Sequence, residues 1–124
     1  MLGKIPRHLM PQIKSGLVPT FIAELTASGV DVLHTTVQAS VLSKSQLELH
    51  EENIMSLMQK PDQLRKPLLC SEDGFVLDGH HRWAANCRLG NEQKVFLVKL
   101  PAVEALRRMQ AFASRHQELC GAKE

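Results

Sequence analysis

The amino-acid sequence predicts an α+β fold, in which a compact single domain holds a small mixed sheet flanked by helices. Three observations lead to this prediction. Apolar residues recur at helical spacing over residues 18–25 and again from Val103 onward. Short runs rich in β-branched residues lie between these segments. Strand and helix patterns intermingle without the regular alternation that builds a parallel α/β sheet, so the class is α+β.

Proline, glycine and short apolar runs delimit the elements. Proline suits the first turn of a helix and glycine the position after its end. Ser-Glu-Asp-Gly between two apolar runs is a strong hairpin signal. The expected elements are, in order, a helix from Pro19 to just before Gly29, one or two short strands over 30–33 and 35–38, a polar turn at 43–46, a helix over 50–60 ended by Pro61, a strand over 67–70, a hairpin turn over 71–74, a strand over 75–78, a helix over 82–89, a strand over 95–100 and a last helix over about 102–119.

Residues 1–17 are expected to form an N-terminal arm, and residues 18–124 the domain itself. Pro6, Pro11 and Gly16 interrupt the arm around a short apolar set. These apolar side chains have no evident place in the predicted elements. We therefore expect the arm to pack on the body of the domain or on a partner, which could be a second copy of the chain.

Charge and composition make several classes of protein less expected. The 124 residues carry a net charge of only +2, whereas dedicated nucleic-acid-binding domains are usually strongly basic. No apolar run is long enough for a membrane-spanning helix, and the first ten residues lack the apolar segment of a secretory signal. Cys70, Cys87 and Cys120 are widely separated, which favours reduced thiols over a disulfide framework or a zinc cluster. We expect a cytoplasmic protein that does not contact a membrane.

The most informative stretch is Asp-Gly-His-His-Arg at 78–82, which directly follows the apolar run Phe-Val-Leu. A strand that turns through glycine into a helix leaves backbone N–H groups unpaired at the helix start, where the helix dipole favours an anion. Gly79 permits a close approach of the backbone to a ligand. Arg82 offers a planar fork suited to phosphate, and His81 can donate to the same group. This pattern predicts a phosphate-binding turn.

The same turn supplies the candidate catalytic residues, His81, His80 and Asp78. Adjacent histidines cannot share one direction, so we expect only one of them to point into a cleft while the other packs or orients. Either one could act as an acid or base near neutral pH. Asp78 has two open interpretations: it holds a divalent metal or orients an imidazole, or it caps the following helix. We expect Trp83 to belong to the core or to a pocket wall.

Residues from about 36 to 100 resemble the ParB/sulfiredoxin-like superfamily. The resemblance is carried by Lys-Pro-Leu-Leu at 66–69, by the run from 73 to 85 that contains Asp-Gly-His-His-Arg, by Leu-Gly at 89–90, and by the order of elements. The signature is most similar to that of ParB-like nuclease domains of phages and mobile elements, and of free-serine kinases with the same fold. The superfamily also includes CTPases and a sulfinic-acid reductase, so the resemblance implies a fold and a pocket but not one activity.

Two departures from relatives narrow the chemistry. Sulfiredoxins carry a reactive cysteine where this chain has His80, and without that thiolate their reaction is not expected. Segregation proteins have Glu-Arg-Arg where this chain has His80, His81 and Arg82, and they continue into a DNA-binding domain. This chain stops about 25 residues after its last expected strand, so a full clamp protein is not expected.

The resemblance further implies that Ser45 and Gln46 face the nucleotide or the metal. A carboxylate from Glu48, Glu51 or Glu52 could serve as metal ligand or base, although acidic residues at a helix start commonly just compensate the dipole. The implied cofactors are Mg²⁺ or Mn²⁺ and a nucleoside di- or triphosphate.

Two functions remain open at this stage. The first is a metal-dependent nuclease or a nucleotide-dependent phosphotransferase. The alternative is a non-catalytic phage or plasmid accessory protein that uses the same fold to bind a host protein or nucleic acid, with residues 1–17 as a contact.

Overall fold

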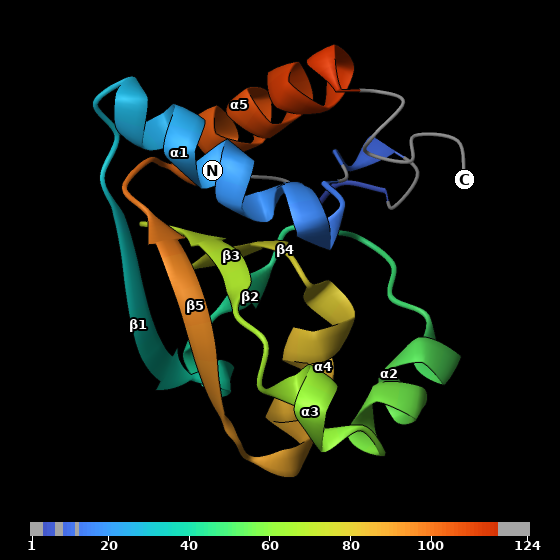
Figure 1. The fold of residues 1–124 in the computed structure, drawn as a ribbon. Coiled ribbons are helices and arrows are strands. Elements are labelled where there is room, and N and C mark those ends of the chain that lie inside the picture. Colours follow the sequence, from blue (N-terminus) through green and yellow to red (C-terminus); the bar gives the residue numbers. More distant parts are fainter. Residues whose placement is uncertain (1–3, 7–8, 12, 117–124) are drawn as a thin grey trace.

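A mixed sheet of five strands forms the centre of the computed structural model (Figure 1), which describes residues 4–6, 9–11 and 13–116. Its strand order is β1-β5-β3-β4-β2. The strands are β1 (Val32–Gln38), β2 (Ser43–Lys44), β3 (Leu68–Ser71), β4 (Phe75–Asp78) and β5 (Glu92–Val98). β1 and β5 pair antiparallel, as do β3 and β4, whereas β3–β5 and β2–β4 are parallel.

Helices flank this sheet. They are α1 (Val18–Ala27), α2 (Glu51–Met58), α3 (Pro61–Leu64), α4 (His80–Leu89) and α5 (Ala102–Arg115), with short 3-10 turns at η2 (Ser15–Leu17) and η3 (Ala39–Val41). In Figure 1, α1 and α5 lie together across the top, and α2, α3 and α4 gather at the opposite end. The α+β class and the helix-flanked mixed sheet are thus confirmed. None of the described helices has the length and hydropathy that crossing a membrane requires.

The larger apolar core lies between the sheet and the pair α1 and α5. Leu77 and Val98 from the sheet meet Met109 and Phe112 from α5, and all four are almost fully buried. The ring of Phe21 in α1 meets Phe112 edge-on, with ring centroids 5.3 Å apart. This core fixes the sheet against α1 and α5.

The other face of the sheet carries a second core. Leu68, Cys70, Val76 and Val95 are buried there, so β3 is covered on both faces. Trp83 from α4 packs against this cluster and against the contact between α2, α3 and α4. Its indole Nε1–H also donates to the Ala39 carbonyl at 2.8 Å. Trp83 therefore belongs to the core, as expected, and it anchors α4 to the sheet.

The described part of the arm packs on the body of the domain. Met10 and Ile13 are each only 5% exposed, within the core formed by α1 and α5. Ile5 lies beside Gln46 as an isolated parallel bridge, and its N–H donates to the Ser45 carbonyl at 2.8 Å. Leu9 is an exception at 60% exposed. Most of the described apolar residues of the arm thus have a place in the chain's own core.

Several boundaries differ from the sequence-based expectation because a partner strand decides them. Residues 43–44 form a strand beside Phe75 instead of a polar turn. β5 runs over 92–98 rather than 95–100, because its first residues pair with the end of β1. Residues 32–38 are one continuous strand for the same reason.

Two helix boundaries also differ. α2 ends at Met58, two residues before the expected end at residue 60, and Pro61 opens α3. α4 begins at His80 instead of residue 82, since Gly79 already takes the turn before it. The last helix is described as far as Arg115, and residues 117–119 of the expected range lie outside the described residues.

Candidate functional site

The turn between β4 and α4 depends on Gly79. A bulge in β4, where Leu69 pairs with Asp78 but Cys70 pairs with Val76, precedes the turn. Gly79 then adopts φ 94° and ψ 29° at the N-cap of α4. A Cβ there would lie 2.9 Å from the Leu68 Cβ and 3.0 Å from Arg82 Nη1. Both the backbone angle and the crowding therefore require glycine.

This arrangement tests one of the interpretations of Asp78. The N-cap is Gly79, and no side chain makes a capping hydrogen bond at this helix. The interpretation of Asp78 as the cap of α4 is therefore wrong. Asp78 instead ends β4, with its carboxyl group beside the start of α4.

His80 is the inward member of the histidine pair. It is 4% exposed, and its Nε2 accepts the backbone N–H groups of Ser45 at 3.2 Å and Gln46 at 3.3 Å. Burial is the main cause that lowers the pKa of His80 to about 4, and the nearby charge of His81 acts in the same direction. A neutral ring matches this geometry, because Nε2 must be unprotonated to accept two N–H groups.

Ser45 and Gln46 are bonded inside the fold. The Ser45 hydroxyl is fully buried and donates to the Val76 carbonyl at 2.6 Å. Gln46 is 4% exposed, and its Nε2 donates to the Glu48 carbonyl at 2.6 Å. Together with His80 these residues join the segment after β2 to the start of α4. Their proposed contacts with a nucleotide stay a prediction, while their contacts with each other are evident.

His81 points the other way, toward α2. Its Nε2 accepts the backbone N–H of His50 at 2.9 Å, and the two rings lie edge to face with centroids 5.8 Å apart. His50 is the N-cap of α2. The two histidines of the turn therefore diverge, as their adjacency requires. The sequence gives no signal for His50, because its backbone rather than its side chain makes the hydrogen bond.

The contact between His50 and His81 brings two helix starts together. Both α2 and α4 begin on the same side of the molecule and run toward the same end in Figure 1. In the described part of the chain, the N–H groups of Glu51 and Glu52 in α2, and of His80 and Arg82 in α4, donate to no other residue. Such donors at the positive ends of two helix dipoles favour an anion.

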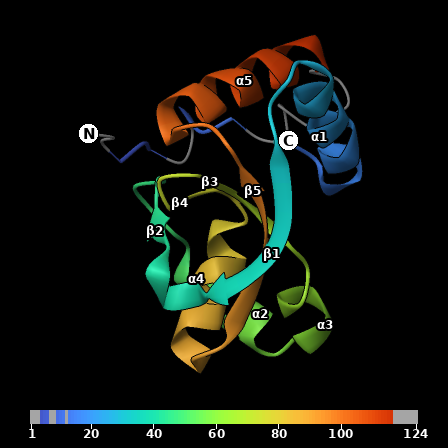
Figure 2. The same cartoon turned by 90° about the vertical axis from the view of Figure 1, so that its left-hand side faces the viewer.

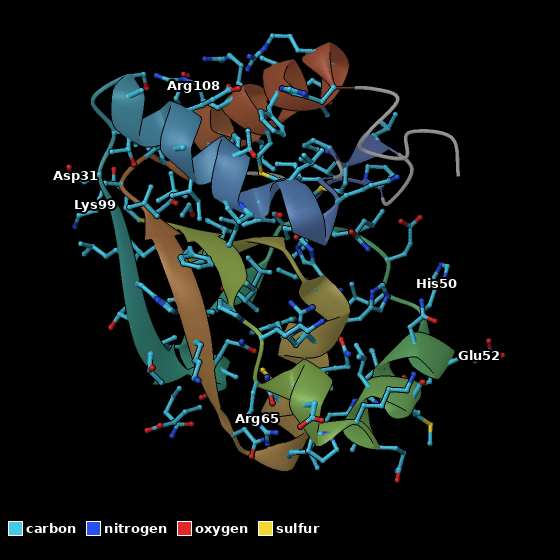
Figure 3. The ribbon with its side chains drawn as sticks, viewed as in Figure 1. Asp31, His50, Glu52, Arg65, Lys99 and Arg108 are labelled. Atoms are coloured by element: carbon cyan, nitrogen blue, oxygen red, sulfur yellow. The ribbon has the colours of Figure 1, made fainter. Side chains whose placement is uncertain are left out.

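The acidic residues at and before the start of α2 differ in their contacts. Glu51 forms a two-pronged pair with Arg88 of α4, with 2.6 Å between Oε1 and Nη2, and this hydrogen bond lowers the pKa of Glu51. Glu52 projects away from the molecule in Figure 3, in which His50 is also labelled. Glu48 is exposed. Glu51 is thus already paired, and dipole compensation accounts for Glu52.

The side chain of Arg82 makes hydrogen bonds to α3 and to the segment that follows it. Its Nε donates to the Gln63 carbonyl at 3.0 Å, and its Nη1 donates to the Pro67 carbonyl at 3.3 Å. Burial lowers the pKa of Arg82, while the charge of Asp78 opposes this shift. Two donors of the guanidinium fork are therefore committed to backbone carbonyls. Nη2 makes no hydrogen bond to the described residues.

The carboxyl group of Asp78 makes no hydrogen bond to any of the described residues. Burial raises the pKa of Asp78 to about 6, and the Arg82 charge opposes this shift. A carboxyl group that titrates near neutral pH can give or take a proton in a reaction. Asp78 thus has the chemical properties of an acid–base residue.

The fit to a metal ion is partial. No group of three or more His, Cys, Asp or Glu side chains in the described residues is placed to hold a metal. Asp78 would contribute a single carboxylate. Mg²⁺ is commonly held by one or two carboxylates together with substrate phosphates, so a bound phosphate would have to supply further ligands.

A separate pocket of about 540 Å³ lies at the far end of α4, and the sequence did not indicate it. Asn86 lies against this pocket, buried, with its Nδ2 donating to Gln93 Oε1 at 2.6 Å. The lining residues are Thr36, Pro61, Leu64, Arg65, Asn86, Gly90, Asn91, Glu92 and Lys94. None of the predicted site residues is among them.

Comparisons with protein-family models, with curated proteins and with solved structures give no significant match. The resemblance to the ParB/sulfiredoxin-like superfamily therefore stays a prediction.

Replacing Gly79 with alanine should destabilise the fold strongly. Gly29 is the matched control, because it has the same φ of 94° but nothing within 4 Å of a Cβ. Gly29→Ala measures the backbone strain alone, about 1–2 kcal/mol. Gly79→Ala should cost about 1–3 kcal/mol more through the clash with Leu68, as urea unfolding would report. Equal losses in the two variants would contradict the role assigned to the crowding.

Asp78 and His80 should affect stability with opposite signs as pH changes. The pKa of His80 falls from 6.5 to about 4 on folding, so its contribution is present above pH 6.5 and is lost on acidification toward pH 4. The pKa of Asp78 rises from 3.8 to about 6, so its contribution is present below pH 3.8 and is lost as pH rises toward 6.

The two contributions therefore oppose each other between about pH 4 and 6. Asp78→Asn should make stability fall more steeply on acidification than in the wild type, and His80→Gln should make it fall less steeply. The free energy of unfolding, measured by urea titration across this range, checks both slopes. Parallel curves for the wild type and either variant would rule out that residue's shift.

Proposed function

We propose that this chain binds the phosphate group of a nucleotide or nucleic acid where α2 and α4 begin, as a ParB-like domain of the ParB/sulfiredoxin-like superfamily. One observation carries the proposal. The hydrogen bond from the His50 N–H to His81 Nε2, at 2.9 Å, joins two helix starts, at which the N–H groups of Glu51, Glu52, His80 and Arg82 have no acceptor among the described residues. Two positive helix ends beside a glycine turn are suited to a phosphate dianion.

We assign each residue of the turn a separate role in binding the phosphate. Gly79 keeps the backbone bare so that a ligand can approach the first turn of α4. The N–H groups of His80 and Arg82 would donate to phosphate oxygens, and Arg82 Nη2 would add charge. His81 borders the same space from α4. His80, Ser45 and Gln46 would support the site indirectly, because their buried hydrogen bonds fix the start of α4.

The chemistry that best fits this arrangement is phosphoryl transfer. It is either hydrolysis of a phosphodiester by a metal-dependent nuclease or transfer from a nucleoside di- or triphosphate. Asp78 would exchange a proton with the reacting oxygen or hold the metal, and His81 is the second candidate for proton transfer. Mg²⁺ or Mn²⁺, held by Asp78 and the phosphate, would neutralise charge on the phosphate oxygens. The proposed location is the cytoplasm of a bacterial or phage-infected cell.

A second candidate function is a non-catalytic accessory protein that binds a host protein or nucleic acid. The observation in its favour is that His80, Ser45, Gln46 and two donors of Arg82 are all bonded within the fold. Residues 1–17 are the proposed contact for such a partner. Since Met10 and Ile13 are buried, that contact would fall on exposed parts of the arm such as Leu9.

Nucleotide binding is the first expected outcome. Titration with nucleoside di- and triphosphates, with and without Mg²⁺, should raise the melting temperature in a dose-dependent way. A ligand at about 100 times its Kd stabilises the folded state by about 2.7 kcal/mol. His81→Ala should remove this shift, whereas His34→Ala, an exposed histidine on β1, should keep it.

Circular dichroism of both variants would verify that they fold. A wild-type protein that binds no nucleotide and cuts neither DNA nor RNA with Mg²⁺ or Mn²⁺ would refute the proposed function. Binding without turnover would favour the accessory protein.

Asp78→Asn should separate binding from turnover. The amide resembles the protonated carboxyl group in shape, and it removes a negative charge from beside the phosphate. Phosphate binding without metal should therefore be kept or strengthened, while Mg²⁺-dependent cleavage or transfer should be lost. Calorimetry measures phosphate binding, and a nuclease or kinase assay measures turnover. Full turnover by Asp78→Asn would show that Asp78 is neither the acid–base residue nor the metal ligand.

A further inference from the structure

One edge of the sheet is open. β1 is an outer strand of seven residues, and it pairs with β5 along its whole length without a bulge. Figures 1 and 2 show no helix along its outer side, and in Figure 2 it runs across the front of the molecule uncovered. Residues 33–36 are all exposed, with Leu33 at 48%. In the described part of the chain, its backbone bonds only to β5.

β1 also lacks the features that commonly prevent an edge strand from pairing with another chain. Natural edge strands are commonly protected by charged residues, proline, bulges or shortness. The sequence of β1 is Val-Leu-His-Thr-Thr-Val-Gln, with no proline and no Lys, Arg, Asp or Glu. The opposite edge is different: β2 has two residues, one of which is Lys44, and Ile5 pairs with the chain just beyond it. The protein thus protects one edge and leaves the other able to pair.

We propose that β1 pairs with β1 of a second copy of this chain, antiparallel about a twofold axis, so that two sheets become one. A twofold axis perpendicular to the sheet makes the paired edge strands antiparallel. The strand is complementary to itself in this arrangement. With Thr35 on the axis, all seven residues pair: Val32 with Gln38, Leu33 with Val37, His34 with Thr36, and Thr35 with its own copy.

The side chains favour this register. Leu33, half exposed in one copy, would cover Val37 of the other, and the pair lies on one face of the joined sheet. Two threonines facing each other are a favourable cross-strand pair. No charged side chain of β1 meets a like charge, because the strand has none. A second copy is therefore the occupant that this edge fits.

The test is the molar mass of the full chain in solution, measured by light scattering or sedimentation over a range of concentrations. The wild type should show a concentration-dependent dimer. Thr35→Lys places two lysines opposite each other on the axis and should weaken the dimer by at least about ten-fold. Thr35→Glu should do the same alone, and an equal mixture of the two variants should restore a dimer.

Thr20→Lys is the matched control, since Thr20 is exposed in the first turn of α1, at the end of that helix farther along the chain from β1, and this variant should dimerise like the wild type. Hydrogen exchange of wild-type β1 gives an independent readout: its outward amides should be protected at high but not at low concentration. A wild type that stays monomeric, including one that binds an extended peptide instead, overturns the proposal. An unchanged dimer in Thr35→Lys also overturns it.

Discussion

The left-handed backbone at Gly79 sets the direction of α4, and the candidate site depends on that direction. After β4 the backbone of Gly79 passes so close to Leu68 and to Arg82 Nη1 that a Cβ on this residue would clash with both. Arg82 in turn donates to the carbonyls of Gln63 and Pro67, so the same turn holds the approach to β3. A glycine turn, an arginine and two carbonyls therefore fix β3, β4 and α4 relative to one another.

Polar groups behind the turn complete this framework. His80 is neutral and buried, and it accepts the N–H groups of Ser45 and Gln46. Buried polar atoms without partners are costly, and within the described residues every fully buried side-chain nitrogen or oxygen has one. The inward histidine thus serves the fold, whereas His81 contacts the start of α2.

Burial acts on the two ionisable groups of the turn in opposite directions. It raises the pKa of Asp78 to about 6 and lowers the pKa of His80 to about 4, because in both cases it disfavours the charged form. The turn therefore carries little side-chain charge from these residues in mildly acidic solution. The field that an anion meets then comes chiefly from the helix starts and from Arg82, which is a suitable setting for phosphate.

The α+β class, the hairpin of β3 and β4 and the divergence of the two histidines could be predicted from the sequence. These follow from local chemistry: apolar periodicity, turn residues and the geometry of neighbouring side chains. Three sets of contacts became evident only in the folded chain: Ser45 and Gln46 donate to His80, Arg82 donates to backbone carbonyls, and His81 accepts from His50. Each of these contacts joins residues 15 or more positions apart and ends on a backbone atom, which any residue type could supply. For that reason the residue types indicate which groups the turn contains, whereas packing determines which of these groups are bonded inside the fold.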